Sequence, residues 1–429
     1  MEAVFLRSSP LRGAMSVPGD KSISHRAAII GALSRGTSAI RNYSPAADCA
    51  STLDVLRQLG VDISRDAEVL HIVGRADSGF EQPVGPLNAG NSGTTMRLLA
   101  GALASQPLDI TITGDDSLLS RPMDRIITPL RIMGASIEDS DGEGHPPLHV
   151  QGKELSGIEY RIPVASAQVK SAVLIAGLRA SGKTTLIEIV PTRDHTERML
   201  ERTCIEIKRE GVIVTIEPGI PEARDLDIPG DVSSAAFLVA AALLCPGSDI
   251  TIPSVGLNPT RTMFLDLLKQ MGADIEVTHE EDDGWEPRGS IRARHGQLSA
   301  IKLAQEDVAR SIDEVTLVAL LATQAEGNTE IRGAHELRHK ESDRIKQTVD
   351  SLGALGACIE ETEDGMIVRG PCPLHGATVS AGRDHRIAMM LGLAGLVAEG
   401  RTTVNGWEWT DISFPGFVNV LKELGARLE

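Results

Sequence analysis

The sequence predicts an α/β protein made of two similar domains, each built from three helix–strand–helix–strand repeats. Two patterns that recur along the 429 residues support this prediction. In one, an amphipathic helix ends at a glycine and a strand follows. In the other, a polar opening precedes a helix of small apolar residues, a turn and a β-rich run. The copies lie roughly 60–85 residues apart, which is too long and irregular for a solenoid.

The first pattern has the form L-x-x-L/M-G-A/V-x-I/L. It occurs at residues 56–63, 130–137, 268–275, 352–359 and 421–428, with a looser sixth copy at 207–214. Because glycine adopts left-handed backbone conformations easily, each copy predicts a helix C-terminus followed by a strand.

The second pattern begins with polar residues that can cap a helix N-terminus. The six openings are Asp20-Lys21-Ser22, Asn91-Ser92-Gly93-Thr94, Ser166-Ala167-Gln168, Asp231-Val232-Ser233, Ser311-Ile312-Asp313 and Asp384-His385-Arg386. In the first of them Asp20, Ser22 or Ser24 is a candidate cap. We expect the unpaired N–H groups at these openings to favour anions.

Residues 17–33 recur without a gap as residues 228–244. The second copy has Val232 in place of Lys21 and Phe237 in place of Arg26, so only the first copy keeps cations at its helix opening. The repeat also predicts the domain boundaries. Residues 1–19 and 230–429 form one discontinuous domain and residues 20–229 form the other, with the active site in the interdomain cleft.

The composition restricts the function classes. A formal net charge of −17 at pH 7 argues against a nucleic-acid or membrane-surface partner. Five scattered cysteines without metal-ligand spacing indicate reduced thiols in a cytoplasmic protein. Residues 1–10 lack the apolar core of a signal peptide, and the longest apolar runs, such as 387–398, are too short to span a membrane.

Residues 177–184, Gly-Leu-Arg-Ala-Ser-Gly-Lys-Thr, match the P-loop pattern. A P-loop follows a strand and precedes a helix. Here residues 169–176 predict a helix and residues 184–190 predict a strand, so the order is reversed. We therefore interpret this segment as an ordinary turn and expect no ATP site.

Several motifs, taken together and in order, resemble the 5-enolpyruvylshikimate-3-phosphate synthase family over essentially the whole chain. They are Gly19-Asp20-Lys21-Ser22-Ile23-Ser24-His25-Arg26, Asn91-Ser92-Gly93-Thr94, Ser120-Arg121-Pro122, Ser166-Ala167-Gln168-Val169-Lys170, Arg338-His339-Lys340-Glu341-Ser342-Asp343-Arg344 and Asp384-His385-Arg386. Arg193-Asp194-His195-Thr196-Glu197, the Ser-Ala-Gln-x-Lys run, and Asn258 with Thr260-Arg261 further resemble the class II branch. The resemblance implies an inverted α/β barrel, with two domains of three βαβαββ units.

The resemblance also implies the activity. Members of this family transfer the enolpyruvyl group of phosphoenolpyruvate to the 5-hydroxyl of shikimate 3-phosphate by addition and elimination, and release phosphate. This reaction belongs to the shikimate pathway, which leads to chorismate and the aromatic amino acids. The resemblance implies no cofactor and no metal, a monomer as the assembly state, and glyphosate as an inhibitor that competes with phosphoenolpyruvate.

Site residues are carried over from the motifs that match. The resemblance implies that phosphoenolpyruvate is bound by Lys21, Gly93, Arg121, Gln168, Arg344 and Arg386. It implies that shikimate 3-phosphate is bound by Lys21, Ser22, Arg26, Ser166, Ala167, Gln168, Arg193, Asp313 and Lys340. Among these and their neighbours, Asp313 matches the base for the hydroxyl and Glu341 the acid for the methylene carbon, with Lys21 sharing the proton transfer.

Three alternatives and one departure stay open. Asp313 is also a candidate helix cap, because aspartate is favoured there. A non-catalytic anion sensor is disfavoured, because Asp313 and Glu341 would only weaken anion binding. The sister enzyme that transfers enolpyruvate to UDP-N-acetylglucosamine uses a loop cysteine, and residues 114–125 contain none. Ile412 stands where many family members have a lysine, so one cation is missing there or supplied from elsewhere.

Overall fold

The computed structural model describes residues 1–8, 10–281 and 284–429. The chain forms two compact units. The discontinuous unit comprises Met1–Pro18 with Pro229–Glu429, and the continuous unit comprises Gly19–Ile228. Each internal boundary between the two units lies one residue before the boundary that the sequence predicted.

The continuous unit contains three four-stranded sheets of the same topology. In order across each sheet, the strands are β16 (Leu226–Asp227), β3 (Thr37–Arg41), β5 (Val69–Val73) and β4 (Ile63–Asp66); β6 (Leu87–Asn88), β7 (Asp109–Thr113), β9 (Leu148–Gln151) and β8 (Ser136–Glu138); β11 (Glu159–Arg161), β13 (Thr184–Ile187), β15 (Ile213–Ile216) and β14 (Ile207–Glu210). In every sheet the first pair is parallel and the other pairs are antiparallel. A short parallel pair joins β10 (Leu155–Ser156) to β12 (Ala180–Ser181).

The discontinuous unit repeats this topology. Its sheets are β2 (Arg12–Ala14), β17 (Asp249–Gly256), β19 (Arg288–Arg294) and β18 (Asp274–His279); β20 (Lys302–Leu303), β21 (Gly327–Ile331), β23 (Gly365–Gly370) and β22 (Cys358–Thr362); and β24 (Thr378–Ser380), β25 (Arg401–Asn405) and β1 (Glu2–Leu6). In the last sheet a bridge from Phe5 to Leu428 takes the place of the fourth strand. Six sheets of one topology confirm the predicted repeats and the α/β fold class.

Each repeat also contributes one inner and one outer helix. The inner helices are α1 (Lys21–Leu33), α3 (Gly93–Leu103), α6 (Ala167–Gly177), α8 (Val232–Leu244), α11 (Val315–Ala322) and α13 (His385–Val397). The outer helices are α2 (Ala47–Gln58), α5 (Asp124–Ile132), α7 (His195–Arg202), α9 (Met263–Gln270), α12 (Arg344–Ala354) and α14 (Phe417–Glu423). The remaining helices are α4 (Asp116–Leu119), α10 (Gln305–Arg310) and two 3₁₀ helices, η1 (His335–His339) and η2 (Trp407–Ile412).

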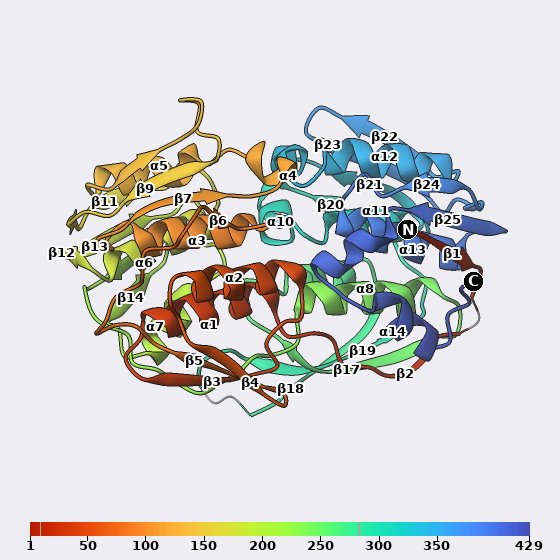
Figure 1. The fold of residues 1–429 in the computed structure, drawn as a ribbon. Helices are drawn as coiled ribbons and strands as arrows, with labels where there is room; N and C mark the ends of the chain where they lie inside the picture. Colours follow the sequence, from red (N-terminus) through yellow and green to blue (C-terminus); the bar gives the residue numbers. More distant parts are fainter. Residues whose placement is uncertain (9, 282–283) are drawn as a thin grey trace. The chain divides into compact units, whose positions relative to one another are not determined.

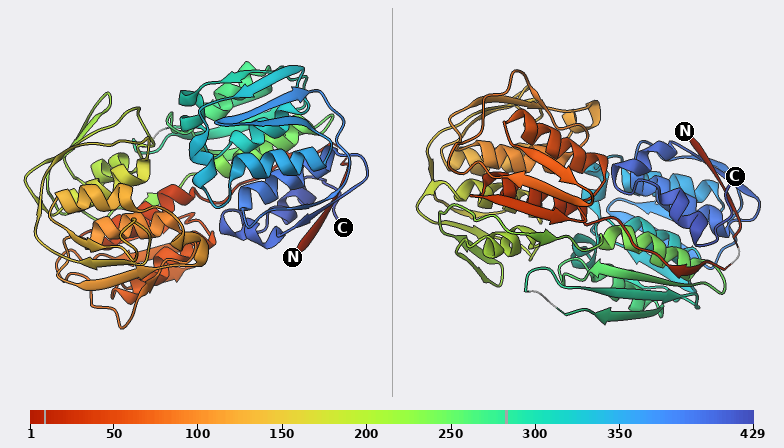
Figure 2. Two further views of the ribbon diagram at one scale, coloured as in Figure 1. Left: turned by 90° about the horizontal axis from the view of Figure 1, so that it is seen from above. Right: turned by 60° about the horizontal axis from the view of Figure 1, so that its bottom comes forward.

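The inner helices lie at the centre of each unit because small and apolar residues make up most of their length. Every residue of α8 and α11 is buried, and Figure 1 shows α8, α11 and α13 together within the discontinuous unit. Figure 2 shows α8, in green, packed along the sheet of β17 and β19. With helices inside and sheets outside, each unit has the inverted arrangement expected. No helix among the described residues has the length and hydropathy needed to cross a membrane.

The segment that matches the P-loop pattern connects a helix to a strand, as predicted, and its middle residues form the short strand β12. Helix α6 ends at Gly177 and strand β13 begins at Thr184. The segment follows a helix and precedes a strand, the reverse of a P-loop, so these residues do not form a phosphate-binding loop.

The looser sixth copy of the helix–glycine–strand pattern was assigned wrongly. Residues 207–214 belong to a hairpin of β14 and β15 that turns at Gly211. The true copy lies seven residues earlier, where α7 ends at Arg202 and Cys204 has a φ of 67°. The other five copies place a glycine at this position, with φ between 79° and 105°. The pattern missed this copy because a cysteine occupies the left-handed position.

We expect Cys204→Gly to stabilise the protein by about 0.5–1 kcal/mol, because a side chain in the left-handed region is strained. The thiol is exposed and its contact is with Arg224 Nη2 at 2.8 Å. Urea unfolding measures the change. Cys204→Ser is the matched control, since it removes the thiol and keeps the backbone strain. An equal gain in the serine variant would contradict the backbone explanation.

Candidate active site

Five of the six predicted helix openings are capped by the expected side chains. Carboxylate or hydroxyl oxygens accept hydrogen bonds from backbone N–H groups at the start of each helix, the caps being Asp20, Ser92, Ser166, Asp231 and Asp384. Of the three candidates for α1, Asp20 is the cap, at 2.9 Å from Ile23 N. The exception is α11, which has Glu314 at its N-cap position and no side-chain cap. Asp313 lies one residue earlier, so the interpretation of Asp313 as a cap is wrong.

In the continuous unit, the two cations of α1 are held by polar partners. Lys21 Nζ lies 2.8 Å from Asp48 Oδ2. Arg26 is buried and donates through Nε to Thr196 Oγ1 and through Nη2 to Ser171 Oγ, both at 2.7 Å. Asp48, Ser171 and Thr196 were not predictable as partners, because they lie 27 to 170 residues away from Lys21 or Arg26 along the chain.

A buried chain of hydrogen bonds links the openings of α1 and α3. His25 Nδ1 lies 2.7 Å from Thr52 Oγ1, and Thr52 Oγ1 lies 2.7 Å from Thr95 Oγ1. Thr95 Oγ1 donates to Ser92 Oγ at 2.8 Å. The Thr95 hydroxyl proton is donated to Ser92, so the Thr95 oxygen accepts from the Thr52 hydroxyl. The Thr52 oxygen in turn accepts from His25 Nδ1–H. The ring is therefore the Nδ1–H tautomer, and its Nε2 has no hydrogen-bond partner in the described part of the chain.

Burial lowers the pKa of His25 well below its ordinary value, and the charges of Lys21 and Arg26 lower it further. The unfolded chain takes up a proton at this ring below about pH 6.5, and the folded chain does not. As the pH decreases below that value, the free energy of unfolding should therefore decrease, by up to about 1.4 kcal/mol per pH unit for this group.

We expect His25→Asn to flatten this part of the pH dependence, since an amide can donate to Thr52 without titrating. Urea unfolding at several pH values from about 7.5 down to 5.5, which brackets the ordinary histidine pKa, measures the slope. His279→Asn, at an exposed ring, is the control. A slope unchanged by His25→Asn would contradict the assignment of a buried neutral ring.

The start of α3 is surrounded by guanidinium groups. Arg97 Nη1 donates to Gln168 Oε1 at 2.5 Å, and Gln168 Nε2 donates to Thr94 Oγ1 at 2.9 Å. Arg121 Nη2 donates to Asn91 Oδ1 at 2.9 Å. The predicted ligands Gln168 and Arg121 therefore lie at the start of α3, where they contact Thr94 and Asn91 of the Asn-Ser-Gly-Thr motif. Arg97 was missed, although its position one turn after Gly93 puts it on the same helix face.

The remaining predicted ligands of this unit lie at three helix starts. Ser166 and Ala167 are the N-cap and first residue of α6, and Ser22 is the second residue of α1. Arg193 precedes Asp194, the N-cap residue of α7, and is partly buried. They therefore lie at helix N-termini, which favour anions.

In the discontinuous unit, Arg344 is the centre of a buried ion-pair cluster. Its Nε lies 2.8 Å from Asp384 Oδ2, its Nη2 2.6 Å from Glu341 Oε2, and its Nη1 3.6 Å from Asp313 Oδ1. Burial lowers the pKa of Arg344, but the charges of Asp384, Glu341 and Asp313 outweigh it and raise the pKa above its ordinary value. Lys340 precedes Glu341 and follows η1.

Arg386 extends this cluster from α13. Its Nη1 donates to Asp313 O at 3.1 Å, and its Nη2 lies 3.7 Å from Asp313 Oδ2. Its Nη1 also lies 3.9 Å from Glu314 Oε1, to which the hydroxyl of Ser233 donates. Arg261 donates to the same hydroxyl at 2.7 Å. The structure therefore brings Asp313, Glu341, Arg344 and Arg386 together, and adds Asp384 and Glu314, which were not predicted as site residues.

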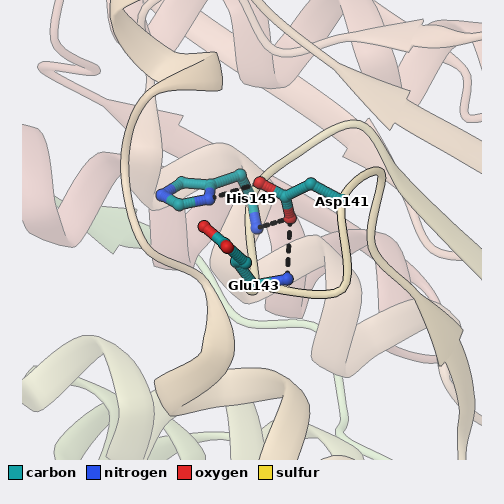
Figure 3. Close-up of side chains that lie close together, drawn as sticks. All are labelled: Asp141, Glu143 and His145. Atoms are coloured by element: carbon teal, nitrogen blue, oxygen red, sulfur yellow. Dashed lines mark hydrogen bonds and ion pairs between the residues drawn. The ribbon is translucent and has the colours of Figure 1, made fainter.

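One group of metal-binding residue types lies outside these clusters. Asp141, Glu143 and His145 share an exposed loop (Figure 3). Asp141 Oδ1 accepts from the backbone N–H groups of Glu143 and His145, at 2.9 and 3.2 Å, and Asp141 Oδ2 lies 2.7 Å from His145 Nδ1. These bonds brace the loop, whose Gly144 carbonyl accepts from Met123 N at 2.7 Å just before α5.

Comparisons with known proteins identify the family of this chain. The family model of EPSP synthase (3-phosphoshikimate 1-carboxyvinyltransferase) matches residues 6–421. A 3-phosphoshikimate 1-carboxyvinyltransferase of Salinibacter ruber is 48% identical over 423 residues, covering 97% of this chain and 98% of the relative. One of Brevibacillus brevis is 44% identical over 420 residues, with the same coverage.

Solved structures give the same result. EPSP synthase from Acinetobacter baumannii superposes with a TM-score of 0.89 at 40% identity, covering 100% of this chain and 99% of that one. The enolpyruvyl transferase NikO from Streptomyces tendae, at 21% identity and a TM-score of 0.82 over 100% and 98% of the two chains, shares the fold. By its fold, its motifs and its relatives, this chain belongs to the EPSP synthase (3-phosphoshikimate 1-carboxyvinyltransferase) family of transferases.

Proposed function

We propose that this chain transfers the carboxyvinyl group of phosphoenolpyruvate to the 5-hydroxyl of shikimate 3-phosphate and releases phosphate. The observation that carries the proposal is the arrangement around Arg344 and Arg386, where cations and two candidate proton-transfer carboxylates share one cluster. An anion-binding site needs the cations, but only a reaction that moves protons needs Asp313 and Glu341 among them.

Both units supply residues for both substrates in this proposal. Phosphoenolpyruvate binds Lys21, Gly93, Arg121 and Gln168 of the continuous unit, and Arg344 and Arg386 of the discontinuous unit. Shikimate 3-phosphate binds Lys21, Ser22, Arg26, Ser166, Ala167, Gln168 and Arg193 of the continuous unit, and Asp313 and Lys340 of the discontinuous unit. The two substrates bring several negative charges, which charge-assisted hydrogen bonds from these residues offset.

In the addition step, the 5-hydroxyl oxygen bonds to C2 of phosphoenolpyruvate and C3 gains a proton. Asp313 takes the hydroxyl proton. Its carboxylate lies within 4 Å of both Arg344 and Arg386, which favour the ionised form that a base needs. In the elimination step, C3 returns a proton to the Glu341 carboxylate and the C2–O bond to phosphate breaks. The phosphate leaves with the proton that Asp313 took from the hydroxyl, and the enol ether remains.

Glu341 delivers the proton to C3 in this proposal, with Lys21 as a further participant. The 2.6 Å contact with Arg344 favours the carboxylate form of Glu341 in the free enzyme. Phosphoenolpyruvate competes with Glu341 for the same guanidinium. Its binding therefore weakens that pair and favours the protonated form, which can act as the acid.

Two other functions are disfavoured. The enzyme that uses UDP-N-acetylglucosamine needs a loop cysteine, which residues 114–125 do not contain. In a non-catalytic anion sensor, Asp313 and Glu341 would lower the affinity for the anion, whereas the transfer reaction uses both carboxylates for proton transfer. We further propose that the protein acts as a cytoplasmic monomer, in agreement with five free cysteines, and that glyphosate inhibits it.

The proposal is tested by measuring phosphate release from shikimate 3-phosphate and phosphoenolpyruvate, without ATP or added metal. Phosphate release that requires both substrates supports the proposal. Release with UDP-N-acetylglucosamine instead would favour the sister activity. Binding of shikimate 3-phosphate without phosphate release would favour the sensor.

We expect Gly93→Ala to weaken glyphosate binding more than phosphoenolpyruvate binding, by about tenfold or more in the ratio of Ki to KM. A Cβ at Gly93 would lie 3.1 Å from Arg97 Nη1 and 3.4 Å from Arg121 Nη1, so it narrows the space beside both guanidinium groups. Glyphosate is longer than phosphoenolpyruvate by one atom between its acidic groups and tolerates less narrowing. Steady-state kinetics of the wild type and the Gly93→Ala variant give the Ki for glyphosate and the KM for phosphoenolpyruvate. Equal fold-changes in the two constants would contradict the explanation.

A further inference from the structure

Arg26 is held by acceptors whose orientation is fixed. Its Nη1 donates to Ser22 O at 2.8 Å, and its Nε and Nη2 donate to the hydroxyls of Thr196 and Ser171. Ser171 Oγ donates its proton to Ala167 O at 2.6 Å, so it accepts from Thr196 Oγ1, which lies 2.7 Å away. Both hydroxyls therefore present lone pairs to the guanidinium. The position of Arg26 depends on how α6, which carries Ser171, is held against α7, which carries Thr196.

The sequence neighbours of these two hydroxyl residues form a buried ion pair between the same helices. Lys170 Nζ of α6 lies 2.7 Å from Glu197 Oε1 of α7. It also lies 3.0 Å from Glu188 Oε2 and 3.3 Å from Thr192 O, so three acceptors surround its three protons. The side chains of Lys170 and Glu197 are each 1% exposed, and that of Glu188 is 5% exposed.

We infer that Lys170 and Glu197 are positioning residues, which set the distance between α6 and α7 and thereby orient Arg26 toward the phosphate of shikimate 3-phosphate. The inference rests on the proposed function, in which Arg26 binds that phosphate. It gives a physical role to two motifs of this chain, Ser-Ala-Gln-x-Lys and Arg-Asp-His-Thr-Glu, because each motif contributes one end of the ion pair.

Stability alone does not account for this cluster. Charged side chains have a large desolvation cost when they are buried, and replacing a buried ion pair by well-packed apolar residues of similar volume is often neutral or stabilising. Burial raises the pKa of Glu197 even though Lys170 opposes the shift. What the pair provides is a defined geometry, since a short charge-assisted hydrogen bond restricts the two helices more than apolar contact does.

The decisive variant removes all three charges and keeps the side-chain volumes: Lys170→Met with Glu188→Gln and Glu197→Gln. We expect this neutral triple variant to melt at the wild-type temperature or higher. We expect calorimetry to show a Kd for shikimate 3-phosphate raised by about tenfold or more, the equivalent of one charge-assisted hydrogen bond. The KM for phosphoenolpyruvate and kcat at saturating shikimate 3-phosphate should stay within about twofold, a difference of less than 0.5 kcal/mol.

A double-mutant cycle tests whether the cluster acts through Arg26. Arg26→Ala alone should weaken shikimate 3-phosphate binding, and adding the three neutral changes should weaken it no further. Lys346→Met with Asp350→Asn, at an exposed ion pair on α12, is the control and should leave the Kd unchanged.

Each outcome discriminates. A folded triple variant with wild-type Kd, or a tenfold loss that persists in the Arg26→Ala background, would overturn the inference and leave the proposed function standing. Absence of shikimate 3-phosphate binding by the wild type would overturn the proposed function, and the inference with it. Should the triple variant unfold, Glu197→Gln alone keeps the Lys170–Glu188 pair and should raise the Kd by about threefold; an unchanged Kd there would overturn the inference.

Discussion

Asp313→Asn should lower kcat by at least about 100-fold while shikimate 3-phosphate still binds. Asparagine keeps the size and polarity of the side chain, but it cannot accept the hydroxyl proton. Because the base acts in the transition state, its loss affects the rate more than ground-state binding. Binding of shikimate 3-phosphate should hold or tighten, since a negative charge leaves a site that receives anions. Steady-state rates and calorimetry on the same preparation measure both quantities.

Glu341→Gln should show the same separation between kcat and binding, because it removes the proposed acid. Arg386→Ala provides the contrast: it removes a cation from the site and should raise the KM for phosphoenolpyruvate strongly. If Asp313→Asn turns over at close to the wild-type rate, the base for the hydroxyl lies elsewhere, and the role of Asp313 is limited to its ion pairs with Arg344 and Arg386.

Arg344→Met should destabilise the protein by about 3–5 kcal/mol, the usual cost of removing one partner from a buried ion pair. The Arg344 side chain is 2% exposed and that of Asp384 is fully buried. Without the guanidinium, Asp384 keeps hydrogen bonds from Ser342 Oγ and Arg386 N but loses its cation. Urea unfolding measures the loss.

Arg294→Met is the matched control for this prediction. Arg294 on β19 also pairs with two carboxylates, Asp274 and Glu276, each at 2.8 Å, but the two acids are half exposed. Water solvates them when the arginine is removed, so stability should change little. Equal losses in the two variants would show that burial of the carboxylates is not what makes Arg344 important.

The fold was largely predictable because each repeat ends a helix at a residue with positive φ, and glycine marks that position in five copies. It was not predictable where Cys204 takes the glycine's place, since the pattern depends on the residue type and the structure depends only on the backbone angle. In the same way, the sequence left Asp313 open between a cap and a base. The start of α11 at Val315 excludes the cap.

For the site, motif residues were predictable and their partners were not. Lys21 and Arg26 stand out as cations at a helix opening, but Asp48 and Thr196 are ordinary surface-type residues in sequence. Arg97, Glu314 and Asp384 were missed as site residues for a similar reason. Which side chains meet is decided by packing between repeats, and a repeat pattern does not encode the contacts of one repeat with another.

The carboxylates around Arg344 and Arg386 have a consequence for ligand selection. In the free protein both guanidinium groups already have anionic neighbours, so an incoming anion exchanges partners with them rather than neutralising two unsatisfied charges. The binding free energy of any anion is then the difference between the free energy of its new contacts and that of the ion pairs it breaks. A single small anion such as chloride replaces too little to compete. In the proposed site, a molecule that carries two acidic groups at a fixed spacing offsets the losses at both arginines together, so the neighbouring carboxylates would lower the affinity for a simple anion more than the affinity for phosphoenolpyruvate.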